Sequence, residues 1–145
     1  MKKSELIVDE IINTFTHGFG LFLSIIGFIF IFFLNTGDSY QKLVLILYNL
    51  TLVVLFLAST LLHGSLAKGK FNSILEKFDY CAIYMLIAGT YTPFALIALK
   101  NNGGHLIFAT IWVFASLGIL YQLFFINKFK FFSNLTYLGM GWLIL

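Results

Sequence analysis

Leu43–Leu62 reads LVLILYNLTLVVLFLASTLL, twenty residues without one charged side chain. An α-helix rises about 1.5 Å per residue, so this stretch spans about 30 Å, the thickness of the hydrocarbon core of a bilayer. The composition of the whole chain also suits a membrane, because 60% of its residues are hydrophobic and only 10% are charged. Soluble domains carry about 25% charged residues. The sequence therefore favours a membrane protein over a soluble domain.

Similar apolar runs divide residues 1–145 into one membrane domain, with approximate spans at 11–34, 43–63, 80–99, 105–126 and 134–145. The last run has twelve residues, which cover about 18 Å as a helix and cannot cross the bilayer. We therefore predict an all-α, polytopic transmembrane helix bundle with four full spans and the start of a fifth. We also expect the sequence to be an N-terminal fragment of a longer protein.

The lysines predict the orientation of the bundle in a cell membrane. With a cytoplasmic N-terminus, the inner segments hold seven of them (Lys2, Lys3, Lys68, Lys70, Lys77, Lys128 and Lys130) and the outer loops hold two (Lys42 and Lys100). This bias obeys the positive-inside rule, so the loops 66–78 and 127–133 are expected to be cytoplasmic. The net charge of +3 suits anionic lipid headgroups, whereas nucleic acid is not expected as a partner, since the lysines flank spans.

Polar residues gather where the second span ends and the third begins. Ser59 and His63 lie one helical turn apart, and Asp79 opens the next apolar run. The order of the segments places them at one depth near the cytoplasmic face, together with Glu10 and His17. Ionisable groups at such positions are costly and usually functional. The alternatives are a solvated His63 and a Ser59 hydroxyl bonded to the carbonyl four residues back.

Two further features concern the third span. Pro93 lies inside it and removes a backbone donor, so we expect a kink there that serves either packing or the shaping of a cavity. Asn101–Gly104 has the composition of a turn, and His105 after it is expected to be solvated. The single cysteine, Cys81, excludes an internal disulfide and a cysteine-based zinc cluster.

Several short motifs resemble those of the hemolysin III family, in order and at the expected spacing. They are Glu10-x-x-Asn13-x-x-Thr16-His17-x-x-Gly20, Ser59-x-x-x-His63, Asp79-x-x-x-x-Tyr84, Ile87-Ala88-Gly89-Thr90-Tyr91-Thr92-Pro93 and Gly139-Met140-Gly141-Trp142. The family belongs with the progestin and adiponectin receptors. The resemblance covers nearly the whole chain, and its combination of motifs is specific although each motif alone is weak.

The resemblance implies seven transmembrane helices, a cytoplasmic N-terminus and a Zn²⁺ ion near the cytoplasmic face. It assigns His63 as a zinc ligand and gives Asp79 a role at the metal, either directly or through a water. Two more ligands would come from a His-x-x-x-His pair on the seventh span, which would lie beyond residue 145. Related membrane proteins are metal-dependent hydrolases of lipid amides.

The resemblance thus implies an integral membrane zinc protein with membrane lipids as partners. If the protein is an enzyme, it is expected to be a metal-dependent hydrolase of a lipid amide or ester. Asp79 and Ser59 are the candidate catalytic residues, and His63 is the candidate metal ligand. Two alternatives stay open: a membrane-damaging hemolysin, and a receptor-like or membrane-homeostasis protein with structural zinc. His17 has either a structural hydrogen bond at the interface or a role in anchoring the helix or handling protons.

Overall fold

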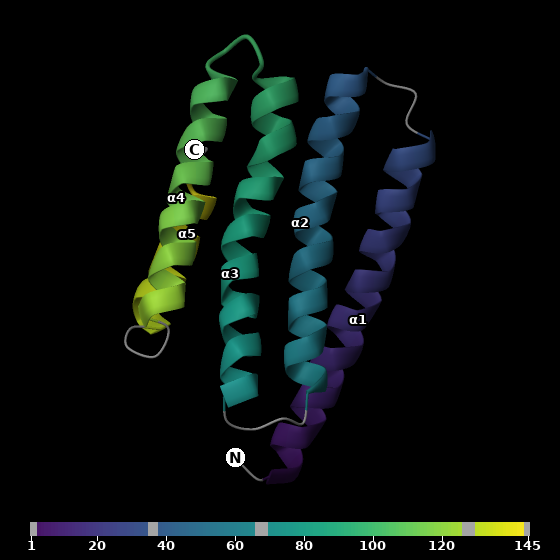
Figure 1. Cartoon of the computed structure of the whole chain (residues 1–145), viewed down its shortest axis with the longest axis vertical. Helices are drawn as coiled ribbons and strands as arrows, with labels where there is room; N and C mark the ends of the chain where they lie inside the picture. The colour runs from purple at the N-terminus through teal and green to yellow at the C-terminus, as the bar shows by residue number, and fades with distance from the viewer. Residues whose placement is uncertain (1–2, 35–37, 66–69, 126–129, 144–145) are drawn as a thin grey trace.

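Helices make up nearly all of the described chain. The computed structural model describes residues 3–34, 38–65, 70–125 and 130–143. Its elements are α1 (Lys3–Leu34), α2 (Ser39–Gly64), α3 (Lys70–Pro93) continued by the π-helix η1 (Phe94–Ala98), α4 (Gly104–Phe125) and α5 (Lys130–Gly141). The first four helices stand side by side in chain order, and α5 packs against α3 and α4 (Figure 1). No strand occurs within these ranges, so the predicted all-α bundle is confirmed.

Four helices are long and apolar enough to cross a membrane. They cover Ile7–Phe33, Ser39–Gly64, Phe71–Ala98 and Gly104–Phe124. A helix satisfies its own backbone hydrogen bonds, which a lipid-embedded segment requires. Large apolar side chains such as Phe15, Phe33 and Leu106 are exposed, as expected for surfaces that face lipid. The fold is therefore that of a multi-pass membrane protein, with α5 as a short fifth helix of 12 residues.

The helices extend beyond the apolar runs that predicted them. α3 begins at Lys70, so Asp79 lies more than two turns inside the helix, although it opens the apolar run. Similarly, α5 begins at Lys130 rather than near Asn134. The reason is that an apolar run marks the part of a helix that lipid surrounds, whereas backbone hydrogen bonding continues into polar residues.

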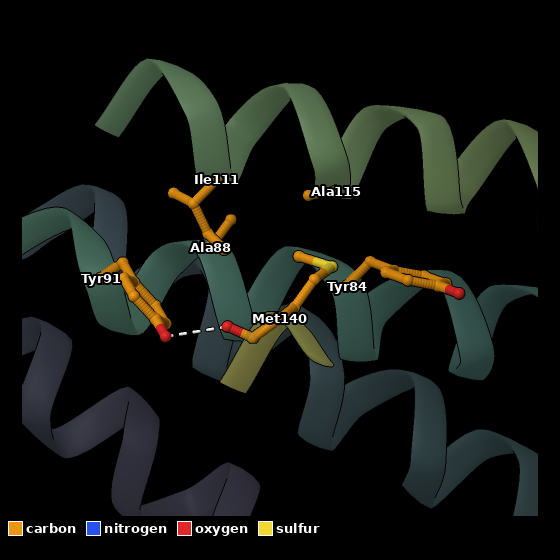
Figure 2. Packing of buried hydrophobic residues seen from close by; sticks show 6 residues of the cluster. All are labelled: Tyr84, Ala88, Tyr91, Ile111, Ala115 and Met140. Carbon is orange, nitrogen blue, oxygen red and sulfur yellow. Dashed lines mark hydrogen bonds between the residues drawn. The ribbon is translucent and has the colours of Figure 1, made fainter. Parts of the chain in front are cut away.

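Tyrosines attach α5 to α3 at three levels. The Tyr137 hydroxyl donates to the Tyr80 carbonyl at 3.0 Å, and the Tyr84 hydroxyl shares a 2.6 Å hydrogen bond with Thr136. The Tyr91 hydroxyl donates to the Met140 carbonyl at 2.8 Å, within a buried cluster that also includes Ala88, Ile111 and Ala115 (Figure 2). Tyr80 and Tyr84 thus contact Thr136 and Tyr137, whereas Tyr91, two turns further along α3, contacts Met140 and Gly141 further along α5. The two helices therefore run parallel.

Small residues of α1 set its register against α2. A Cβ atom at Gly20 would lie 2.5 Å from the Phe56 ring, and one at Gly27 would lie 3.1 Å from the Asn49 amide nitrogen. Close contacts of this kind at small residues are typical of helix pairs in membranes. The pairs run in opposite order along the two helices, so α1 and α2 are antiparallel. The first turns of α1 therefore lie beside the last turns of α2.

The helix does not end at Pro93, because it continues as η1. The Leu99 amide donates to the Phe94 carbonyl at 3.0 Å, five residues back, which is the π-helical pattern. Nearby, the Thr92 hydroxyl donates to the Ala88 carbonyl at 2.8 Å and accepts from the Trp112 indole at 3.1 Å. The predicted turn follows, with Gly103 at a φ of 78°. Proline thus changes the winding of the helix without stopping it.

Candidate functional site

The predicted polar residues meet at one end of the bundle. The beginning of α1, the end of α2 and the first half of α3 lie together there, beside the N-terminus (Figure 1). This N-terminal end of the bundle carries five side chains that we call the polar cluster: Glu10, His17, Ser59, His63 and Asp79. His105 lies at the opposite end and is exposed, as the sequence predicts.

Ser59 and Asp79 form a hydrogen bond that joins α2 to α3. Ser59 is 4% exposed, and its hydroxyl donates to Oδ1 of Asp79. The alternative that Ser59 bonds a carbonyl of its own helix is therefore not what the structure shows. A carboxylate has about four lone-pair positions on its two oxygens, of which Ser59 uses one. Asp79 consequently retains the capacity to accept from a water or to bind a cation.

His63 is held by a residue that the sequence did not assign to it. Its Nδ1 lies 2.7 Å from Oε2 of Glu10, with the two side chains 23% and 53% exposed. A carboxylate can only accept a hydrogen bond, so Nδ1 is the donor. In a neutral imidazole Nε2 then carries the lone pair that a metal requires. Instead of being simply solvated, His63 has a fixed partner on α1.

His17 stacks on His63. The two ring centroids are 5.5 Å apart and the ring planes differ by only 9°, while the Phe56 ring lies 6.2 Å from His17. Imidazole lone pairs lie in the ring plane, so two stacked rings direct them along nearly parallel planes. The structure brings His17 into the cluster as a neighbour of His63.

The donors in the described residues fit only part of a zinc site. Within those ranges, no group of three histidine, cysteine, aspartate or glutamate side chains could hold a metal ion. Zinc takes three or four protein ligands, and imidazole nitrogen and carboxylate oxygen are both suitable. His63 and Asp79 thus have donor atoms that suit zinc, in insufficient number for a complete site.

Other polar contacts hold the same end of the bundle together. The Lys77 ammonium donates to the Leu123 carbonyl at 3.2 Å, where it caps the last turn of α4. The Ser133 hydroxyl donates to the Gln122 side chain at 2.9 Å, and both residues are buried. In the sequence, Lys77 contributes only to the predicted orientation, and the other residues of these contacts and the Glu10–His63 pair have no predicted role. The spacing of the glycines on α1 is the signal that could have placed Glu10 beside the end of α2.

Comparisons with known proteins place this geometry in context. The family model described as Haemolysin-III related matches residues 6–145. A Hemolysin-3 homolog from Bacillus subtilis (strain 168) is 42% identical over 141 residues, which is 96% of this chain and 66% of that protein. Hemolysin-3 from Bacillus cereus is 38% identical over 146 residues, 99% of this chain and 66% of its own length.

A more distant relative is the human Monocyte to macrophage differentiation factor. It is 30% identical over 134 residues, which cover 89% of this chain and 56% of that protein. No solved structure matches the chain. This chain thus spans just under two thirds of the length of the two bacterial relatives and a little over half of the human one.

Proposed function

This chain belongs to the Haemolysin-III related family, and from that premise we propose that its polar cluster is one side of a zinc site in a lipid hydrolase. The observation that carries the proposal is the hydrogen bonding of the His63 imidazole. Its Nδ1 is engaged by Glu10, which leaves Nε2 for a metal, and the Ser59–Asp79 pair lies one helical turn away. A metal-binding histidine usually donates its other nitrogen to a carboxylate or carbonyl in this way.

The donors in the described residues are too few for a complete zinc site, so the proposal requires further ligands. His63 and Asp79 supply at most two, whereas a catalytic zinc site has three protein ligands. The bacterial relatives are about half as long again as this chain, so additional helices can bring the missing ligands. The resemblance noted above supplies a candidate, a His-x-x-x-His pair on a seventh span.

Each residue of the proposed site would have a different role in hydrolysis. Zinc, when bound, supplies a Lewis acid that polarises a carbonyl and makes water more acidic. His63 would hold the ion, Ser59 would fix the carboxylate of Asp79, and Asp79 would accept a proton from the attacking water. The water oxygen bonds to the carbonyl carbon, the carbon–nitrogen or carbon–oxygen bond breaks, and the proton passes to the leaving group. Because the cluster lies at the end of the spans, the substrate is an amide or ester at the headgroup level of a lipid.

We place this end of the bundle in the cytoplasm on the basis of the seven-to-two lysine bias. A green fluorescent reporter fused after Lys70 should fluoresce, whereas alkaline phosphatase fused at the same point should be inactive. The same two reporters fused after Asn102 should give the reverse result. An active phosphatase after Lys70 would contradict the orientation and would move the proposed site to the outer leaflet.

Removing the His63 imidazole should remove the metal. In the full-length protein, purified in detergent with added zinc, we expect roughly one zinc ion per chain by mass spectrometry and less than about a tenth of that in His63→Ala. His105→Ala, at the opposite end, is the control and should keep its zinc. Thermal unfolding of both variants shows whether they are folded. Unchanged zinc in a folded His63→Ala variant would refute the ligand assignment.

A further inference from the structure

Two side chains of α1 surround the His63 ring, one at its edge and one at its face. We infer that Glu10 and His17 are positioning residues, which fix the tautomer and the plane of the His63 imidazole for metal binding. This inference rests on the proposed zinc site and adds to it a role for α1. It also answers the question that the sequence left open about His17.

Glu10 determines which nitrogen of His63 carries the proton. A solvated neutral imidazole exchanges between two tautomers, with the proton on Nδ1 or on Nε2. The 2.7 Å contact with Glu10 selects the tautomer protonated on Nδ1, because the carboxylate has no proton to donate. Only this tautomer presents an Nε2 lone pair. Without Glu10, part of the population would have to change tautomer before a metal could bind.

The backbone that carries Glu10 is closely fitted to α2. Thr14, one turn further along α1, donates its hydroxyl to the Glu10 carbonyl at 2.7 Å. The methyl carbon of Thr14 lies 3.2 Å from the position of a Cβ atom at Gly64, the residue after His63. Glu10 and His17 are seven residues apart, so they lie two turns apart on the same face of α1. The helix contact therefore brings both side chains to His63 together.

His17 acts through the face of the ring. Its 5.5 Å stacking at 9° holds the plane of His63, and Phe56 borders His17 in turn. This role requires a flat ring and no ligating nitrogen. The two α1 residues thus restrict different degrees of freedom of one imidazole. A substitution that keeps the flat ring should preserve the role of His17, whereas one that removes the ring should not.

The test of Glu10 compares Glu10→Ala, Glu10→Gln and Asp9→Ala in the full-length protein. Asp9 is the matched control, because it is an acid at the same end of α1 but lies about 100° around the helix. The first measurement is the ¹⁵N spectrum of His63 without metal, which reports the tautomer. The second is the Kd for Zn²⁺ alone, from competition with a fluorescent chelator. A merely structural role for Glu10 would not change the tautomer.

We expect Glu10→Ala to lose the Nδ1-protonated signal and to weaken zinc binding by about 10- to 100-fold. Glu10→Gln keeps an accepting oxygen, so it should retain most of the signal and weaken binding less. Asp9→Ala should stay within about twofold of the wild type. The inference about Glu10 fails if Glu10→Ala leaves the tautomer unchanged, or if its Kd matches that of Asp9→Ala.

The His17 variants and His63→Ala complete the experiment. His17→Phe should bind zinc about as well as the wild type, whereas His17→Ala should bind it more weakly. Loss of zinc in His17→Phe comparable to that in His63→Ala would make His17 a ligand and would overturn its positioning role. Zinc retained in His63→Ala would instead refute the proposed function, while the tautomer measurement would still decide whether Glu10 orients the ring.

Discussion

Replacing Gly104 with alanine should destabilise the protein by about 3 kcal/mol, the upper end of the usual cost of overpacking. A Cβ atom at Gly104 would lie 2.6 Å from the Leu99 carbonyl oxygen and even closer to that of Ala95. Both atoms are backbone, so neither can move aside by a rotamer change. The Gly104 amide also donates to the Leu99 carbonyl at 3.0 Å, and this hydrogen bond holds the two backbone segments at a short distance. Thermal or denaturant unfolding in detergent measures the loss.

Two other glycines are controls for the close contact. Gly103 has no atom within 4 Å of its would-be Cβ, but its φ is 78°, so Gly103→Ala should cost about 1–2 kcal/mol from backbone strain alone. Gly139 lies inside α5 with open space around it, and alanine there should be neutral or stabilising by up to about 1 kcal/mol. If Gly104→Ala is as stable as Gly139→Ala, η1 and α4 do not approach each other as closely as the structure shows.

The four membrane spans could be predicted from the sequence because the length and apolarity of a membrane helix are local properties. A run such as Leu43–Leu62 has the length and the apolarity of a membrane helix whatever its neighbours do. The true ends of the helices were harder to predict, since helices continue into polar residues. This is why Asp79 lies inside α3 rather than at its start.

The candidate site was predictable in its location but not in its pairings. The order of the segments is enough to bring Glu10, His63 and Asp79 to one end of the bundle. Which side chain meets which depends on the rotation and register of the helices, which the close contacts at Gly20 and Gly27 set in three dimensions. The Glu10–His63 bond therefore appears only in the structure.

The tyrosine contacts that hold α5 were also missed, for a different reason. A tyrosine in a membrane helix is equally consistent with packing, interface anchoring and a hydrogen bond across helices. Only the position of α5 shows that Tyr91 donates to the Met140 carbonyl and Tyr137 to the Tyr80 carbonyl.

Changing Asp79 should slow the proposed reaction strongly without removing the metal site at His63. If Asp79 accepts the proton of the attacking water, Asp79→Asn should lower the turnover of a fluorogenic medium-chain lipid amide by about 100-fold or more. Asparagine keeps the shape of the side chain but cannot take up a proton. Zinc content should remain close to that of the wild type if Asp79 acts through water. A parallel loss of zinc would instead make Asp79 a direct ligand.

Ser59 should act through Asp79, and a double-mutant cycle tests this. Ser59→Ala removes a hydrogen bond to a charged group, so we expect about a tenfold loss of turnover. When Asp79 is already asparagine, Ser59→Ala should cost little more, because the two residues act as one unit. Ser116→Ala is the control, since that exposed hydroxyl donates to the Trp112 carbonyl of its own helix at 2.8 Å. Additive losses would mean that Ser59 acts independently, for example on the substrate, and that its bond to Asp79 contributes only to helix packing.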